Sequence, residues 1–169
     1  MAMRSLRMEG DMILKKTSKP VEEINDKIIQ LLDDMVETMY HHGGAGLAAV
    51  QVGVLRRIVV VDITEDNTDT IEFINPEIVH REGSQMSKEG CLSVDGLMGD
   101  VERPDVLIVR GLNRNGEEFE VRADEYLAVA LDHELDHLDG VLYTEKAKAM
   151  FRRTDDDNPK KRGKKRRRK

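Results

Sequence analysis

Two histidines four residues apart, His133 and His137, give the sequence its clearest chemical signal. Residues at this spacing lie on the same face of an α-helix, so their imidazoles can bind one metal ion. Glu134 lies beside the pair, where its carboxylate would be near a metal position left open for water. The same motif also occurs by chance on charged helix surfaces, so a third ligand has to be found before it indicates a catalytic metal.

The third ligand does not follow the histidines in the sequence. Tyr143 stands where one metalloprotease class has a third histidine, and the acids beyond His137 are too close to it or belong to the charged C-terminal segment. Upstream, the only cysteine, Cys91, lies in the segment EGCLS, residues 89–93. Its thiolate beside two imidazoles would complete a three-ligand set. The alternative role for a lone cysteine is packing as a small apolar residue.

Two helices are needed to build this site and support it. Residues 125–139 are expected to form the helix that carries the histidines, with Asp124 as its N-cap and Gly140 as its stop. Residues 21–40 have apolar side chains every three or four positions, which predicts an amphipathic N-terminal helix. A short C-terminal helix is expected at residues 145–153.

The strands are expected to pair as antiparallel hairpins. Residues 57–63 are rich in β-branched side chains, and a second strand, residues 71–79, is interrupted by Pro76. Residues 106–113 and 117–123 flank an Asn-Gly turn typical of a β-hairpin. The sequence therefore predicts an α+β fold, with antiparallel sheets packed around a central metal-binding helix.

The 169 residues fit one domain, and no stretch approaches the roughly 18 to 20 apolar residues of a membrane span. No signal peptide is recognisable, so we expect a soluble, cytoplasmic protein without a membrane partner. The net charge of −6 is unevenly distributed: residues 160–169 contain nine Lys or Arg and no acid, whereas the rest of the chain has 18 basic and 33 acidic residues. We expect a catalytic domain over residues 1–154 and a disordered basic tail over residues 155–169.

Three short motifs occur together and in a fixed order. They are GAGLAAVQ at residues 44–51, EGCLS at residues 89–93 and HELDHL at residues 133–138. With these motifs the chain resembles the peptide deformylase family from about Met3 to Met150. The resemblance implies a hydrolase that removes the formyl group from the N-terminal formyl-methionine of new polypeptides. Formyl-methionyl nascent peptides would then be its substrates.

The resemblance also implies a role for each motif residue. Cys91, His133 and His137 would bind the metal, with water in the fourth position. Glu134 would act as general acid–base on that water. Negative charge would develop on the formyl oxygen during the reaction. The side-chain amide of Gln51 and the backbone N–H of Leu92 would stabilise it.

Other positions would support the substrate or the metal ligands. Gly44, Ala45 and Gly46 would line the cleft, where missing or small side chains let a peptide backbone pair as an extra strand. Glu89 and Arg103 would form a pair that steadies the loop around Cys91. On the metal-binding helix, the apolar residues one turn before the first histidine could line a methionine pocket; these are Tyr126, Val129 and Ala130.

The sequence departs from the family at three positions. Asp95 stands where the family often has proline, Asp132 stands where it often has glutamine before the first metal histidine, and Ala45 stands where it often has Ile or Val. None of the three is a metal ligand, so they bear on substrate preference rather than on activity.

The metal and the partners are open to alternatives. A His₂Cys set suits zinc, iron(II), nickel or cobalt; the resemblance implies iron(II) in the cell, with Zn, Ni or Co as substitutes in purified protein. A zinc endopeptidase would share the helix motif but need a His or Glu as third ligand. A nucleic-acid-binding protein with a structural metal would have a filled coordination sphere. The basic tail, Lys160 to Lys169, favours a ribosome contact through phosphates, without sequence-specific recognition of nucleic acid.

Overall fold

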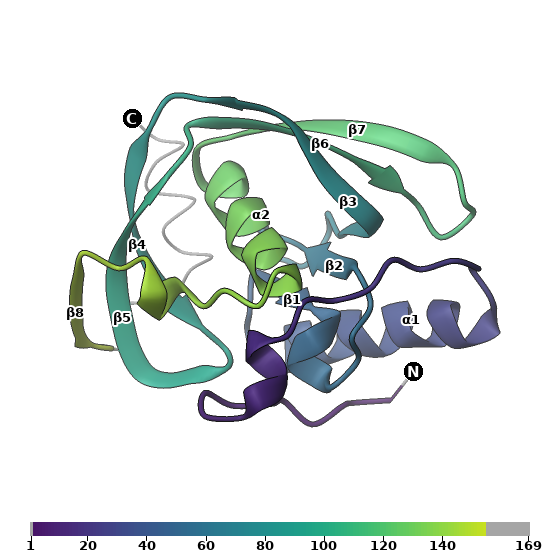
Figure 1. Ribbon diagram of the computed structural model, residues 1–169, viewed down its shortest axis with the longest axis horizontal. Helices are drawn as coiled ribbons and strands as arrows, with labels where there is room; N and C mark the ends of the chain where they lie inside the picture. Colours follow the sequence, from purple (N-terminus) through teal and green to yellow (C-terminus); the bar gives the residue numbers. More distant parts are fainter. Residues whose placement is uncertain (1, 155–169) are drawn as a thin grey trace.

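The computed structural model describes residues 2–154, which fold into two α-helices and two antiparallel sheets (Figure 1). The helices are α1 (Asp26–His41) and α2 (Glu125–Leu138), with short 3-10 helices η1 (Met12–Lys15), η2 (Ala49–Val52) and η3 (Tyr143–Glu145). The first sheet has the order β1 (Gly46–Ala48), β2 (Ile58–Val61), β3 (Ile71–Glu82), β6 (Val106–Leu112) and β7 (Glu118–Asp124). The second has the order β4 (Gln85–Cys91), β5 (Val94–Arg103) and β8 (Ala149–Arg152). The α+β prediction is confirmed.

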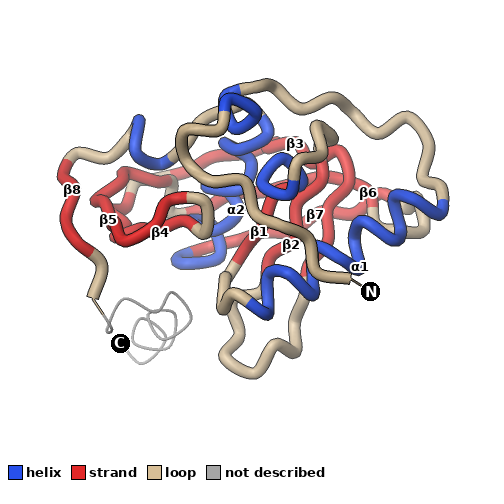
Figure 2. Tube along the Cα trace, turned by 90° about the horizontal axis from the view of Figure 1, so that it is seen from below, coloured by secondary structure: helices blue, strands red, loops and turns tan. Residues whose placement is uncertain are grey.

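Strand β2 separates two apolar cores. Its four residues are all buried, and because side chains alternate along a strand, they face opposite sides of the sheet. Ile58 and Val60 pack with Met35 and other apolar residues of α1, whereas Val59 and Val61 pack with Leu131 and other residues of α2. Figure 2 shows α1 beside the first sheet, near the N-terminus. The β-branched run in the sequence is thus a strand buried on both faces.

Helix α2 lies between the two sheets, at the centre of the molecule (Figure 1). Every residue from Ala128 to Leu135 is buried, including the charged ones. A helix enclosed on all sides holds its polar side chains in fixed surroundings, which suits a site that needs defined geometry. The predicted range of this helix is confirmed. Asp124 occupies the N-cap position, but its side chain makes no capping hydrogen bond.

The first helix begins later than predicted. Asn25 is its N-cap and accepts a hydrogen bond from the backbone N–H of Ile28, so the helix starts at Asp26 and not at Val21. The backbone N–H and carbonyl of Val21 instead bond to the side chain of Asn75 in β3. A long-range partner therefore holds Val21 outside the helix.

The predicted short C-terminal helix over residues 145–153 is wrong. In the described chain, one 3-10 turn, η3, is followed by strand β8, which pairs antiparallel with β5 from Leu97↔Arg152 to Asp100↔Ala149. Without β8, this edge of β5 would present unpaired backbone groups, and pairing satisfies them. The predicted tail, residues 155–169, lies outside the described residues.

The hairpin β4–β5 was not predicted from the sequence, whereas the strands at β2, β3 and the β6–β7 hairpin were. Its strands contain many polar residues and glycines and few β-branched ones. The register runs from Gln85↔Arg103 to Cys91↔Val94, which places Cys91 at the tight end of the hairpin.

None of the helices in the described chain is long and apolar enough to span a membrane.

Candidate metal centre and active site

The structure brings Cys91, His133 and His137 together in the interior. Their ligand atoms all lie within 4.8 Å of one another, and all three residues are buried. The Sγ atom of Cys91 lies 3.4 Å from Nε2 of His137. Helix α2 supplies both histidines from one face, and the end of the β4–β5 hairpin supplies the thiol. The site is therefore a buried Cys-His-His set suited to a single divalent metal ion.

The hydrogen bonding of His133 fits metal binding. Its Nδ1 atom lies 2.8 Å from Oε1 of Glu89. A carboxylate accepts hydrogen bonds, so the ring proton is on Nδ1 and the lone pair on Nε2 is available to a metal. Burial alone would raise the pKa of Glu89, but hydrogen bonds from Arg103 and His133 outweigh burial and hold that pKa below its usual value. Glu89 is therefore charged and orients the ring.

Glu134 is buried next to the histidines. Burial is the main cause that raises the pKa of its carboxyl group to about 7. Its Oε2 atom has no hydrogen-bond partner among residues 2–154. The carboxyl group can therefore take up and release a proton near neutral pH.

The side-chain amide of Gln51 is held at both ends. Its Oε1 accepts a hydrogen bond from the backbone N–H of Ala48 at 2.9 Å. Its Nε2 donates to Oγ of Ser93 at 3.1 Å and lies 3.5 Å from Sγ of Cys91. These contacts direct the NH₂ group of Gln51 toward the metal ligands. Ser93 was not predicted to have a role, although it lies in the same motif as Cys91.

A pocket opens onto these groups from the surface. Gly44, Ala45 and Gly46 line this pocket, as do Tyr126, Val129 and Ala130 of α2. Leu92 also lines it. The sequence pointed to all of these positions. It missed Lys88 and Met98, which also line the pocket, because strands β4 and β5 were not predicted. It also missed Arg153, which follows β8, because a helix was predicted there.

Arg103 lies behind the metal ligands and is 1% exposed. Its Nε and Nη2 atoms donate to the two carboxylate oxygens of Glu89, each at 2.8 Å. Glu89 in turn bonds to His133. A continuous chain of hydrogen bonds therefore links β5 to a metal ligand on α2.

Comparisons with known proteins agree with this site. The profile of the family described as polypeptide deformylase matches residues 3–153. The peptide deformylase of Acetivibrio thermocellus is 51% identical over 168 residues, covering 99% of this chain and 95% of that protein.

Solved structures show the same fold. The peptide deformylase of Thermotoga maritima superposes with a TM-score of 0.84 at 35% identity, covering 88% of this chain and 100% of that one. The enzyme from Legionella pneumophila gives a TM-score of 0.84 at 36% identity and covers 99% of both chains. The buried Cys-His-His set, the profile match and the near full-length relatives lead to one conclusion: this chain belongs to the polypeptide deformylase family and has peptide deformylase activity.

Proposed function

We propose that this chain hydrolyses the N-formyl group of formyl-methionyl nascent polypeptides in the cytoplasm and releases formate. The observation that carries the proposal is the clustering of Cys91, His133 and His137 beside a pocket that is also lined by Glu134 and Gln51. A small acyl group that enters this pocket meets a metal site, a proton carrier and an amide donor together. That combination suits hydrolysis of a short amide.

The metal site is proposed to hold iron(II) in the cell. A bound divalent ion supplies Lewis acidity, which makes water a stronger acid and polarises a carbonyl group. Iron(II) binds such donors more weakly than zinc by the usual order of affinities. Purified protein is therefore expected to contain Zn, Ni or Co in place of iron unless iron is protected during preparation.

Glu134 is proposed as the general acid–base. It accepts a proton from the attacking water, whose oxygen forms a bond to the formyl carbon. It then delivers the proton to the nitrogen as the carbon–nitrogen bond breaks, which leaves formate and a free α-amine. A carboxyl group whose pKa is about 7 suits both directions of this transfer at neutral pH.

Gln51 and the backbone N–H of Leu92 are proposed as donors to the formyl oxygen, on which negative charge develops. The contacts of Gln51 with Ala48 and Ser93 hold its amide in place before the reaction begins. A donor held in advance needs no reorganisation in the transition state, which is what makes such a donor effective.

The strand-like segment at Gly44, Ala45 and Gly46 is proposed to bind the peptide backbone of the substrate as an added strand. The apolar side chains of Val129 and Ala130, which line the same pocket, would accommodate the methionine side chain. Ala45 stands where the family often has the larger Ile or Val. Its small side chain leaves more room in the pocket, so we expect the enzyme to accept substrates whose first side chain is larger than that of methionine.

Measuring formate release separates this function from the alternatives. A zinc endopeptidase needs a His or Glu as third ligand, whereas the cluster contains Cys91. A structural metal needs a filled coordination sphere, whereas three ligands leave room for water. We expect formate release from a formyl-Met dipeptide and no cleavage of an internal peptide bond in an acetylated peptide of the same sequence. Internal cleavage, or no release by metal-replete protein, would contradict the proposal.

We further propose that residues 1–154 form the catalytic unit and residues 155–169 a separate basic tail. Nine positive charges at Lys160 to Lys169 can bind ribosomal RNA phosphates by releasing counterions, whereas the remaining −15 charge of the chain is repelled. A tail that holds the enzyme near emerging chains would raise their effective concentration.

Deleting residues 160–169 tests the role of the tail. We expect unchanged activity on short formyl-Met peptides and loss of co-sedimentation with ribosomes. Binding of the intact chain should weaken steeply between about 50 and 200 mM salt. Equal co-sedimentation with and without the tail would refute the tether.

A further inference from the structure

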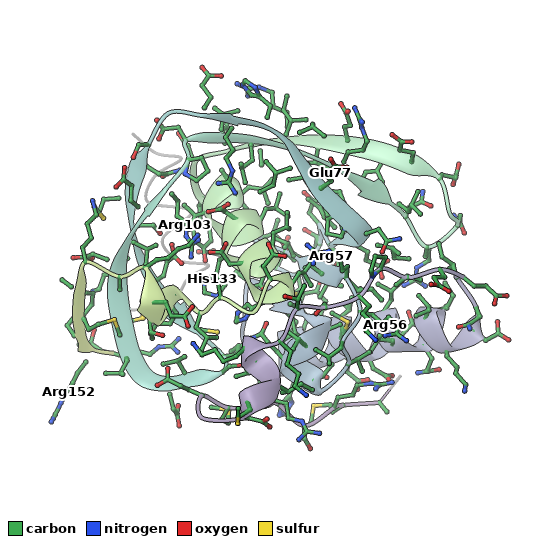
Figure 3. All side chains as sticks on the ribbon, viewed as in Figure 1. Arg56, Arg57, Glu77, Arg103, His133 and Arg152 are labelled. Atoms are coloured by element: carbon green, nitrogen blue, oxygen red, sulfur yellow. The ribbon has the colours of Figure 1, made fainter. Side chains whose placement is uncertain are left out.

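Arg103 is a buried cation in contact with three carboxylates. Besides its two bonds to Glu89, its Nη1 atom lies 3.1 Å from Oδ2 of Asp132 and 2.6 Å from Oδ2 of Asp136. Asp132 is 2% exposed. Figure 3 shows Arg103, at the end of β5, close to His133 of α2. The guanidinium group of Arg103, on β5, therefore contacts two aspartates of α2 and also Glu89, which bonds to the metal ligand His133.

One cation cannot balance these three carboxylates. Asp132 and Asp136 are four residues apart on one helix face, where like charges repel. Burial makes an uncompensated charge still more costly, because water cannot solvate it. Further cations are needed for this cluster to be stable.

The structure supplies them from outside. Nη1 of Arg81, at the end of β3, lies 2.9 Å from Oδ1 of Asp132. This contact is an ion pair without the alignment of a hydrogen bond, so it acts through charge. Nζ of Lys146 lies 2.8 Å from Oδ2 of Asp136. The side chain of Arg81 is 52% exposed, so Arg81 is a surface residue that neutralises a buried acid. Each aspartate then lies between Arg103 and an outer cation.

The inner end of the cluster reaches the metal site. Oε1 of Glu89 lies 2.8 Å from Nη2 of Arg103 and also 2.8 Å from Nδ1 of His133. If Asp132 loses its outer cation, its full charge acts on Arg103 and draws the guanidinium away from Glu89. The hydrogen bond that Nδ1 of His133 donates to Glu89 then loses its support. A glutamine at position 132 would need no outer cation, since its amide is neutral.

We infer that Arg81 is a positioning residue for the metal ligand His133, acting from the protein surface through Asp132, Arg103 and Glu89. The inference rests on the ligand set of the proposed function. Arg81 lies outside the pocket and outside the three motifs, so the inference adds a distant residue to those that hold the metal ligands in place. It also assigns a role to Asp132, the residue that departs from the family's usual glutamine.

The variant Arg81→Gln tests this inference through metal release. Zinc-loaded protein is mixed with an excess of a chromogenic chelator, and the rate of zinc transfer is followed. Replacing a partner that directly supports a metal ligand typically costs 10- to 100-fold in metal affinity, so a more distant partner should speed release by about 10-fold. Arg110→Gln is the matched control, because Arg110 lies on β6 and pairs with the exposed Glu118 and Glu120. It should release zinc at the wild-type rate.

A second variant identifies the path. Adding Asp132→Asn to Arg81→Gln removes the unbalanced charge and should return zinc release close to the wild-type rate. Wild-type release by Arg81→Gln, or fast release that Asp132→Asn does not correct, would overturn the inference. Circular dichroism before mixing shows that each variant is folded. Formate release is measured in parallel: if the wild type releases none, the proposed function fails, whereas the zinc comparison still decides the role of Arg81.

Discussion

Gly46 in β1 and the carboxyl group of Glu134 in α2 are in such close contact that no side chain fits between them. A Cβ atom at position 46 would lie 2.7 Å from Oε1 and 2.9 Å from Cδ of Glu134. The backbone of Gly46 is not in the left-handed region, so its neighbour, and not its conformation, requires glycine here. This contact fixes how closely the proposed proton carrier approaches the pocket wall.

Replacing Gly46 by alanine should displace the carboxyl group of Glu134. Misplacing a reacting group by about 1 Å can cost about 10²-fold in rate, so we expect kcat for formate release to fall by that order. Metal occupancy of the same variant is the control and should stay at the wild-type level, because Gly46→Ala leaves Cys91, His133 and His137 unchanged. A kcat close to the wild-type value would contradict this account.

The metal ligands and the proton carrier should be separable by mutation. Cys91→Ala removes a ligand, so we expect loss of bound metal together with loss of turnover. Glu134→Ala leaves all three ligands, so metal analysis should find normal occupancy while deformylation falls by about 10²–10⁴-fold. Full metal occupancy in Cys91→Ala, with normal turnover, would return this cysteine to a packing role.

Gln51→Leu should lower kcat and kcat/KM together, because the amide is proposed to bind charge that develops in the transition state. Loss of one such donor typically costs about 10²–10³-fold. Ser93→Ala should give a smaller loss of the same kind, since it removes only the contact that orients the amide. Steady-state kinetics on a formyl-Met dipeptide measure both variants. An increase in KM alone would mean that Gln51 serves substrate binding.

Asp34 on α1 should make stability depend on pH. Burial would raise its pKa, but hydrogen bonds from Ala2, Gln30 and Arg4 outweigh burial, so the pKa lies below the ordinary 3.8. A depressed carboxyl pKa contributes stability above the unfolded value, and this contribution is lost as the pH falls through the folded value.

We therefore expect Asp34→Asn to lower the free energy of unfolding by about 1–3 kcal/mol at pH 7, a difference that shrinks below about pH 4. Urea unfolding at several pH values measures it. Asp95→Asn, at an exposed position, should stay within about 0.5 kcal/mol of wild type throughout. A difference for Asp34→Asn that is the same at pH 3 and pH 7 would exclude a charged role.

Features that depend on local pattern could be predicted from the sequence alone. Helical periodicity placed His133 and His137 on one face of α2, and β-branched residues predicted the strand at β2. The Asn-Gly turn predicted the β6–β7 hairpin. These features need only neighbouring residues, because spacing along one element fixes which side chains share a face.

Long-range contacts decided what the sequence could not. Strand β8 forms because the edge of β5 pairs with it, and Val21 stays outside α1 because Asn75 in β3 holds its backbone. No local signal in the sequence predicts the β4–β5 hairpin, yet this hairpin carries Cys91 to the histidines. The bond between Ser93 and Gln51 and the support of Arg103 by Arg81 through Asp132 likewise join segments far apart in the chain. Such contacts depend on tertiary packing, because no periodicity along one segment specifies which distant side chain will balance a buried charge.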